Sequence, residues 1–326
     1  MQLHLPGQSG EEKEYVIVTL IVVNWNGGEL ILRLLTSLRN CRPDLPWPLE
    51  VVVVDNASSD GSADRIAQDA PEVTLIRSGV NRGFAGGCNL GAQFARSPYL
   101  LFLNPDTEVS ALTLVRSVEF MEAPEQSRVG IVGVQLVDER GQVTRSSARF
   151  PRAVMFLAQN FGLDRAVPRW GHAMREWAHD ETREVDQVIG AFFLTRRGLF
   201  EQLQGFDERF FVYFEEVDFA YRARQLGFRS VYLADVQAFH EGEGTTSQVR
   251  GRRLFYLLRS RLLYGRKHYG PAENLLNFIN TLLLEPLSRA AFLTLTGRRE
   301  ELPPLREGFA LLYRDLPNIM LRRMRP

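Results

Sequence analysis

Short apolar runs alternate with amphipathic stretches over the first hundred residues of the chain. Runs rich in Val, Ile, Leu and Phe predict buried strands, whereas apolar residues spaced three or four apart predict helices. The predicted strands are 15–24, 50–56, 72–78 and 99–103, and the predicted helices are 28–39, a stretch from 58–60 to about 68, and a stretch that follows the glycine-rich loop 79–87 and ends near 96. This alternation predicts a mostly parallel sheet with helices on both faces.

The second half of the chain has a less regular pattern. Its predicted strands are 129–138, 185–197 (which runs into a turn) and 230–236 (which leads to His240). Residues 205–228 begin as an aromatic-rich loop and predict a helix from about Glu215. From Arg250 onward the spacing is helical, and the interrupting prolines are Pro271, Pro286, Pro303 and Pro304. We therefore expect a large α/β domain over 1–249 and a helical extension over 250–326.

Charge is unevenly divided between these two parts. The chain has 326 residues, is 45% hydrophobic and 24% charged, and has a formal net charge of zero. Residues 250–326 contain 15 Lys/Arg and 6 Asp/Glu, an excess of nine positive charges that 1–249 offsets. A basic segment predicts an anionic partner, such as phosphates or a membrane surface, or else a solvated helical face. Cys41 and Cys88 have neither metal-ligand nor disulfide spacing, which is typical of a reducing compartment.

The chain shows no convincing membrane-crossing pattern. Residues 1–14, MQLHLPGQSGEEKE, are polar and acidic, unlike a signal peptide. The apolar run at 15–23 is about half of a membrane span. Residues 274–297 come closest to a span, but Glu285, Pro286 and Arg289 interrupt them, so we expect this segment to lie on a membrane at most. The expected location is the cytoplasm, with the inner face of the plasma membrane as an open alternative.

Asparagine or aspartate follows each of the four predicted strands of the first half. These residues are Asn24 with Asn26, Asp55 with Asn56, Asn81 to Asn89, and Asn104 with Asp106. Ligands of open α/β sheets bind beyond the carboxyl ends of the strands. Packing alone does not explain such a set of polar residues, so the sequence predicts a binding site at this edge.

Asp55 ends a buried strand, VVVVD, and can accept hydrogen bonds from ribose hydroxyls. The alternative is that Asp55 only caps the following helix. The GxGxxG fingerprint of NAD sites is absent after the first strand, where the sequence reads NWNGGEL. The pattern therefore disfavours an NAD-dependent oxidoreductase and favours a nucleotide held without a helix-terminal pyrophosphate cradle.

The segment NRGFAGGCN (81–89) contains three glycines that allow close backbone approach, Gly83, Gly86 and Gly87. Arg82 could bind a phosphate there. The alternative is a glycine-rich turn that packs a helix onto the sheet. On its own this signal is weak.

Asn104 and Asp106 flank Pro105 directly after the apolar run 99–103. Two oxygen ligands on a tight turn suit a hard divalent cation, Mg²⁺ or Mn²⁺, that also keeps water and diphosphate oxygens. Such a cation would neutralise a departing diphosphate. The alternative is a proline-assisted Asx turn without a metal.

The densest acidic cluster is FEEVDFAYRAR (214–224). Acids in a first helical turn favour the helix dipole, which is the structural interpretation. The aromatic lead-in would also desolvate an acid and raise its pKa, as a general base requires. Glu216 and Asp218 are the sharper candidates for this base. An i,i+4 pair between Asp218 and Arg222 would make Asp218 structural and leave Glu216 to act.

Taken together, these segments resemble the family 2 glycosyltransferases with the A-type nucleotide-sugar fold. The bacterial rhamnosyltransferase-like enzymes of cell-envelope polysaccharide synthesis are the most similar branch. The matching segments span about 22–245 and are VVNWNG, VVVVDNASSDGS, NRGFAGGCN, FLNPDTEV, VIGAFFLTRR, GFDERFFVYFEEVDFAYRAR and His240. The resemblance implies a mostly parallel, Rossmann-like sheet flanked by helices.

The resemblance also implies residue roles. Glu216 would be the catalytic base of an inverting transfer, with Asp106 and His240 as ligands of Mg²⁺ or Mn²⁺. The nucleotide-sugar site would be formed by Asn24, Asn26, Asp55, Asn56, Arg82, Gly83, Asn89 and Asn104. The acceptor side would include Gly190, Ala191, Glu215 and Asp218. Asn104 stands where the family often has Asp, which predicts weaker metal binding that depends on the bound diphosphate.

The branch favours dTDP-rhamnose as donor, with UDP-linked hexoses as an alternative. The expected acceptor is a glycan or a polyprenyl-linked sugar, with membrane contact through 250–326 and no nucleic acid. A non-catalytic nucleotide-sugar-binding protein with the same fold is the competing hypothesis. Measured sugar transfer, or slow hydrolysis of the donor, would exclude it.

Overall fold

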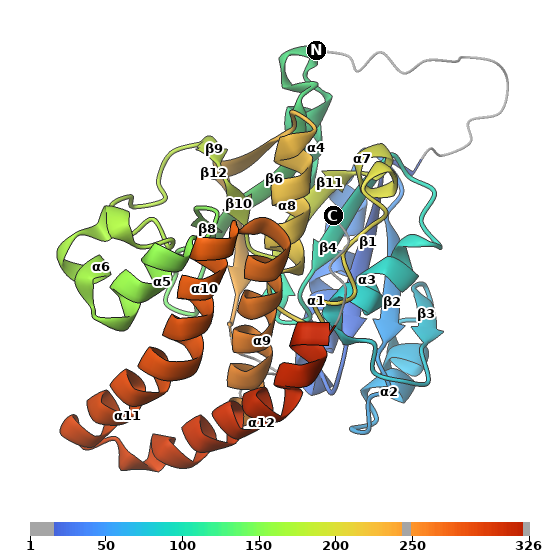
Figure 1. Ribbon diagram of the computed structural model, residues 1–326. Coiled ribbons are helices and arrows are strands. Elements are labelled where there is room, and N and C mark those ends of the chain that lie inside the picture. The colour runs from blue at the N-terminus through green and yellow to red at the C-terminus, as the bar shows by residue number, and fades with distance from the viewer. Residues whose placement is uncertain (1–15, 243–248, 322–326) are drawn as a thin grey trace, which may run out of the picture.

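A curled, mostly parallel sheet lies at the centre of the protein (Figure 1). The computed structural model describes residues 16–242 and 249–321. The sheet-forming strands in these ranges are β1 (Val18–Asn24), β2 (Glu50–Asp55), β3 (Thr74–Arg77), β4 (Tyr99–Leu103), β5 (Thr107–Glu108), β6 (Val129–Val137), β7 (Val143–Thr144), β9 (Arg183–Val185), β11 (Phe192–Arg196) and β12 (Arg229–His240). The order along the sheet is β3-β2-β1-β4-β11-β6-β12-β5, with β7 beside β6 and β9 beside β12. A separate ribbon pairs β8 (Ser147–Ala148) with β10 (Gln187–Val188).

The first four strands of that order are parallel to one another, as the β-α alternation predicts. β11 is antiparallel to both of its neighbours, β4 and β6, and so joins the two halves of the sheet. The register sets Asn24 beside Asp55. It also sets His240, on β12, beside Thr107, on β5. The polar residues at the strand ends therefore meet along one edge.

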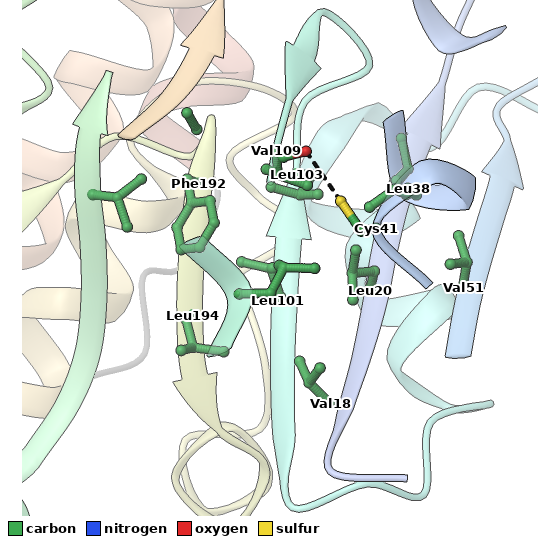
Figure 2. Close-up of a cluster of buried hydrophobic side chains, with 14 of the residues drawn as sticks. Val18, Leu20, Leu38, Cys41, Val51, Leu101, Leu103, Val109, Phe192 and Leu194 are labelled. Atoms are coloured by element: carbon green, nitrogen blue, oxygen red, sulfur yellow. Dashed lines mark hydrogen bonds between the residues drawn. The ribbon is translucent and has the colours of Figure 1, made fainter. Parts of the chain in front are cut away.

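Helices cover both faces of this sheet. The α-helices within residues 16–242 are α1 (Gly28–Cys41), α2 (Ser62–Asp69), α3 (Gly83–Ala92), α4 (Ala111–Glu122), α5 (Ala153–Asn160), α6 (Leu163–Ala166), α7 (Arg197–Gln202) and α8 (Glu215–Gln225). α1, α2 and α4 contribute to one buried cluster, and α3, α7 and α8 contribute to the cluster on the other face. Figure 2 shows the first of these clusters, where Leu20, Leu101 and Phe192 come from three adjacent strands. Cys41 lies at its edge and donates its thiol hydrogen to the Val109 carbonyl, at 3.2 Å.

Two predicted boundaries are wrong. The segment 79–87 was expected to be a loop, but α3 begins at Gly83. Its glycines let the helix lie close to the sheet, because a Cβ on Gly87 would be 2.8 Å from a Val23 methyl group. The strand expected at 230–236 extends to His240 in β12, which has a register shift between Leu233 and Gln237. Residues 1–15, including the segment judged unlike a signal peptide, lie outside the described residues.

The C-terminal helices pack beside α8 and its lead-in loop (Figure 1). They are α9 (Arg250–His268), α10 (Pro271–Ile279), the π-helical segment Asn280–Leu284, α11 (Glu285–Leu295) and α12 (Leu302–Leu321). Phe210, Phe214 and Val217 share a buried cluster with Leu258 of α9 and Leu312 of α12. Burial of this many apolar side chains fixes the extension against the sheet domain. None of the helices within 16–242 and 249–321 is both long and apolar enough to span a membrane.

Candidate active site

A pocket of about 480 Å³ opens at the sheet edge where the strand ends meet. Its lining comes from six regions far apart in the sequence. These regions are Val23, Trp25 and Asn56; Asn81, Gly83 and Phe84; Asn104, Pro105 and Asp106; Ile189, Gly190 and Ala191; Phe211, Val212, Tyr213, Glu215 and Glu216; and His240, Val249, Arg252, Arg253 and Tyr256. Nine of the fifteen predicted site residues line this pocket, but only three of the eight predicted for the nucleotide sugar do so.

Asn24 and Asp55 lie beneath this lining as a buried pair. The Asn24 amide donates to an Asp55 oxygen at 3.0 Å, and also to the hydroxyls of Ser58 (3.1 Å) and Ser62 (2.8 Å). Asp55 further accepts from the Ser58 amide at 3.3 Å. Asn26, in the left-handed region with φ 50°, accepts from the Ser59 amide at 2.8 Å. These bonds shape the loop after β2, and none of the three predicted residues lines the pocket.

Asn56 and Gly83 do line the pocket, and they are bonded to each other. The Asn56 amide donates to the Gly83 carbonyl at 2.8 Å, and its oxygen accepts from the Arg82 backbone at 3.1 Å. Gly83 has φ 73°, and a Cβ there would lie 2.1 Å from the Phe211 carbonyl oxygen, so no larger residue fits. The Arg82 side chain points elsewhere: it is exposed, donates to the Ser78 hydroxyl at 2.9 Å, and lies outside the lining.

Asn89 also lies outside the lining. Its oxygen accepts from the Phe206 amide at 2.9 Å, and its amide donates to the Phe206 carbonyl at 2.8 Å and to Glu208 at 3.0 Å. These bonds hold the loop before α8 against α3. The structure therefore places Asn89 as a support for that loop.

Asp106 and His240 face each other across the β5–β12 pairing. The closest Asp106 oxygen is 3.4 Å from His240 Nε2, and the Asn104 amide nitrogen is 3.5 Å from the same atom. Two ligands at 90° around a cation with bonds of about 2.1 Å would be separated by about 3 Å, so a carboxylate and an imidazole at this spacing suit Mg²⁺ or Mn²⁺. Across the described ranges, no three His, Cys, Asp or Glu side chains cluster as a metal site would require. The remaining ligands would have to be water and substrate oxygens.

Two adjacent carboxylates stand at the start of α8. Glu215 is buried and Glu216 half-buried, and within the described structure one oxygen of each is buried without a hydrogen-bond partner. Burial raises the pKa of Glu216 to about 7. Burial, and then the charge of Glu216, raise the pKa of Glu215 well above its usual range.

The backbone before these acids is strained. Tyr213 and Phe214 both have positive φ, 67° and 70°, a region that side-chain-bearing residues rarely adopt. Such strain costs of the order of 1 kcal/mol or more per residue and is concentrated at functional sites. Here it turns the chain so that α8 begins with its acids beside the pocket.

Asp218 has the opposite surroundings from Glu215 and Glu216. It is fully buried and contacts two cationic side chains, Arg222 at 2.7 Å and Lys267 at 2.6 Å, and the His268 ring at 2.7 Å. The His268 hydrogen bond and the charges of Arg222 and Lys267 outweigh the effect of burial and lower the Asp218 pKa. The predicted Asp218–Arg222 pair is confirmed, and Asp218 does not line the pocket.

Gly190 and Ala191 line the pocket on the side of β11. The Ala191 carbonyl accepts from the Asn104 backbone N–H and from the Thr107 hydroxyl, each at 3.2 Å. A Cβ on Gly190 would lie 3.5 Å from the Phe84 ring, which is ordinary contact. These residues connect the proposed acceptor side to the turn that carries Asp106.

Sequence reasoning missed the contribution of the C-terminal extension. Val249, Arg252, Arg253 and Tyr256 all line the pocket, and their spacing puts them on one face of α9. The Tyr256 ring stacks on Phe211, with centroids 4.8 Å apart. The i, i+3, i+4, i+7 spacing was visible in the sequence, but nothing in it showed that this face meets the strand ends.

The architecture is that of the A-type glycosyltransferases, as solved neighbours show. A mannosyltransferase from Pyrobaculum calidifontis, in complex with GDP-Man and Mn²⁺, aligns with a TM-score of 0.52, 22% identity, and coverage of 95% of this chain and 89% of that one. Staphylococcus aureus TarS 1-349 in complex with UDP-GlcNAc also aligns with a TM-score of 0.52, at 18% identity over 90% of this chain and 79% of that one. At such identities the likeness shows the fold alone.

The chain belongs to glycosyl transferase family 2, whose model matches residues 19–204. It is 28% identical over 246 residues to an N-acetylglucosaminyl-diphospho-decaprenol L-rhamnosyltransferase of Mycobacterium tuberculosis, covering 71% of this chain and 78% of the relative. It is 26% identical over 234 residues to the rhamnosyltransferase WbbL of Escherichia coli, covering 69% and 83%. The protein is therefore a glycosyltransferase, and the resemblance inferred from the sequence is confirmed.

Proposed function

We propose that this glycosyltransferase moves a sugar from a nucleoside-diphosphate donor to an acceptor hydroxyl with inversion, using Glu216 as the general base. The observation that carries the proposal is the state of the Glu216 carboxyl group. One of its oxygens has no hydrogen-bond partner among the described residues, and its pKa of about 7 suits proton removal near neutral pH. Glu216 lines the same pocket as Asp106 and His240, so the proposed base and the proposed leaving-group site share one cavity.

In the proposed step, Glu216 takes the proton of the acceptor hydroxyl. The acceptor oxygen then forms its bond to the sugar C1, while the bond from C1 to the diphosphate oxygen breaks and its electron pair leaves with the diphosphate. Attack in line with the leaving group inverts the anomeric centre. Glu215, kept largely protonated by burial, leaves Glu216 as the carboxylate that accepts the proton.

Asp106 and His240 would hold the divalent cation, with Asn104 beside them. A bound Mg²⁺ or Mn²⁺ would offset negative charge on the diphosphate. The neighbour from Pyrobaculum calidifontis was crystallised with Mn²⁺, which supports a metal in this fold. Because Asn104 offers a neutral oxygen, we propose that metal binding strengthens when the diphosphate is present.

We propose rhamnose, carried by dTDP, as the transferred sugar, with UDP-linked hexoses as the second choice. Support comes from the two relatives named as rhamnosyltransferases. The mycobacterial relative is named for a decaprenyl-diphosphate-linked acceptor, so the proposed acceptor here is a lipid-linked glycan of the cell envelope. With these substrates, we propose that the reaction takes place in the cytoplasm.

The test is a transfer assay with labelled dTDP-rhamnose and UDP-sugars on a lipid-linked acceptor, followed by NMR of the product's anomeric configuration. We expect one donor to react, an inverted product, and loss of activity with EDTA and in Asp106→Ala. Asp64→Ala changes an exposed carboxylate that does not line the pocket; it is the matched control and should remain active. Donor binding without transfer or hydrolysis would instead support a non-catalytic nucleotide-sugar-binding protein, and a retained anomeric configuration would contradict inversion.

We further propose that the extension touches the membrane through an apolar face. Arg259, Arg261 and Lys267 of α9 are buried in ion pairs and unavailable to lipid. By contrast, α10, the π-helical segment and α11 leave large side chains exposed. These are Leu275, Ile279, Leu283, Leu287, Phe292 and Leu295. A lipid-linked acceptor would reach the pocket from such a surface.

Flotation with phosphatidylglycerol vesicles tests this contact. Wild type should float, and Leu283→Ser with Leu287→Ser should reduce the floated fraction several-fold. Leu112→Ser, an exposed leucine on α4, is the control and should float like wild type. If the double variant floats equally, or if wild type stays at the bottom, this face does not bind lipid.

A further inference from the structure

One face of α9 supplies the cations of the pocket. Val249, Arg252, Arg253 and Tyr256 follow the i, i+3, i+4, i+7 pattern of a helix, and all four line the cavity. Among the lining residues in the described structure, Arg252 and Arg253 are the only lysines or arginines. The same wall carries three carboxylates, Asp106, Glu215 and Glu216. The pocket therefore has an acidic part and a cationic part that come from different regions of the chain.

The position of this face is fixed by contacts further along α9. Arg259 donates to the Arg209 carbonyl at 2.9 Å and pairs with Asp315 at 2.7 Å. Ser260 donates to the Val212 carbonyl at 2.9 Å. Tyr256 stacks on Phe211. Because these contacts join α9 to the loop that leads to Glu215 and Glu216, the arginines are held in a set relation to the base.

Two helices of the extension, α9 and α12, also lie close together at this end of α9. A Cβ on Gly251 would lie 2.2 Å from a Glu307 oxygen, and one on Gly308 would lie 2.9 Å from the Gly251 carbonyl oxygen. α12 therefore packs directly on the first turn of α9, next to Arg252 and Arg253. The arginine face is part of a packed structure rather than of a loose tail.

Arg82, the residue that the sequence favoured for a phosphate, lies outside the lining and donates to Ser78. Arg252 is exposed and Arg253 half-buried. The nucleoside diphosphate that leaves carries more negative charge than one divalent cation offsets, and guanidinium groups match phosphate oxygens with paired donors. The geometry thus assigns the phosphate-binding role to a different pair of arginines.

We propose that Arg252 and Arg253 of the C-terminal extension bind a diphosphate in the active-site pocket. The proposal rests on the proposed transferase function. The diphosphate has two potential sources, the nucleotide-sugar donor and a polyprenyl diphosphate acceptor, and both present the same chemical group. In either case the pocket is complete only when 250–326 is present.

Calorimetric titration of the full chain with Mn²⁺ present tests the proposal. The probes are dTDP and UDP for the donor, farnesyl diphosphate in detergent for the acceptor, and dTMP as a ligand that lacks the second phosphate. The variants are Arg252→Gln and Arg253→Gln, each with its Lys counterpart, which keeps the charge but loses the paired donors. Arg250→Gln is the matched control, because Arg250 is exposed on the same helix turn but does not line the pocket. Thermal unfolding checks that each variant is folded.

We expect at least one Gln variant to bind its diphosphate about 10- to 100-fold more weakly, the Lys variant to fall between, and dTMP to lose less. A loss confined to dTDP or UDP assigns the pair to the donor, and a loss confined to farnesyl diphosphate assigns it to the acceptor. Unchanged affinity for all diphosphates in folded Gln variants, while wild type binds, would overturn this inference and leave the transferase function standing. Failure of wild type to bind any diphosphate would overturn the inference, and the transfer assay would then decide the function separately.

Discussion

Two sets of carboxylates lie within four residues of each other at the start of α8, and their surroundings are opposite. Glu215 and Glu216 each keep a buried oxygen without a hydrogen-bond partner among the described residues. Asp218, one turn along, contacts Arg222, Lys267 and His268. The same helix therefore has one acid pair with raised pKa values and one acid with a lowered pKa.

The difference shows how the extension serves the site. Lys267 and His268 belong to α9, so two of the three side chains that contact Asp218 come from the C-terminal part of the chain. They hold α8 in place while leaving Glu216 uncompensated and beside the pocket. We propose that Asp218 is a positioning residue and that Glu216 is the proton acceptor. A carboxyl group in a cleft with a strongly shifted pKa is typical of a functional site. The contrast therefore distinguishes the candidate catalytic residue, Glu216, from the residue that stabilises the helix, Asp218.

The largest expected effect is on catalysis. Glu216→Gln should lower kcat by about 10²- to 10⁴-fold, because the variant lacks the base that takes the acceptor proton. Its unfolding free energy should not fall below that of wild type, since no ion pair is lost and burial already disfavours the ionised carboxyl in the folded state. Steady-state transfer kinetics and urea unfolding measure the two quantities. Glu201→Gln, the same change at an exposed residue of α7, should leave both unchanged. A kcat within threefold of wild type would rule out Glu216 as the base.

Asp218→Asn should act on stability instead. Removing one charge from this buried cluster leaves Lys267 and Arg222 poorly compensated, which should lower the unfolding free energy by about 3–5 kcal/mol at pH 7. The matched change Asp64→Asn removes an exposed pair with Arg77 and should cost under about 1 kcal/mol. Urea denaturation curves at pH 7 measure both.

The stability effect of Asp218→Asn should depend on pH. The folded-state pKa of Asp218 lies below its unfolded value, so the stabilisation is present above about pH 4 and is lost as the pH falls through the folded pKa. The difference between wild type and Asp218→Asn should therefore shrink on acidification. Equal stability of the two at pH 7 would show that the cluster does not hold α8.

Lys267→Met should have an intermediate effect. Lys267 joins Asp207, at 2.8 Å, to Asp218, at 2.6 Å, but both acids keep other cationic partners. We expect a loss of about 1–3 kcal/mol in unfolding free energy. A double-mutant cycle with Asp218→Asn measures the coupling between the two sites. Additive effects would mean that the extension and α8 are not linked through this lysine.

The smallest expected effect is a gain. Glu215→Gln removes a buried carboxyl whose raised pKa opposes ionisation in the folded state, so the variant should be more stable than wild type by about 1 kcal/mol at pH 8. Because the unfolded carboxyl ionises above about pH 4 and thereby favours unfolding, the gain should grow from pH 5 to pH 8. Thermal unfolding at several pH values tests this. A gain that does not change with pH would have another cause.

Local patterns predicted most of the sheet domain. The apolar runs that form β1, β2 and β4 are continuous and rich in β-branched residues or Leu. Such runs are typical of buried parallel strands in α/β proteins. The polar residues at their ends could be placed at one edge because parallel strands share a direction. The helical extension after Arg250 followed from its spacing and prolines.

What the sequence could not predict depends on contacts between distant segments. Asn89 and Arg82 belong to a motif near the nucleotide side, yet their bonds go to Phe206 and Ser78 and not into the pocket. The lining role of Arg252 depends on how α9 packs against the loop before α8, about 40 residues earlier. The start of α3 at Gly83 could not be predicted because glycine is a poor helix former. Its glycines are explained by close packing, of Gly83 on Phe211 and of Gly87 on Val23 of β1.

The most direct test of the central claim is the pH dependence of kcat/KM for wild type and for Glu216→Gln. A carboxyl base with a pKa of about 7 is protonated and inactive at lower pH, so the wild-type value should fall about tenfold per pH unit below pH 7 and level off above it. The residual activity of Glu216→Gln should lack this inflection. A wild-type profile that is flat from pH 5 to pH 8, or an inflection near pH 7 that persists in Glu216→Gln, would contradict the assignment of Glu216 as the base.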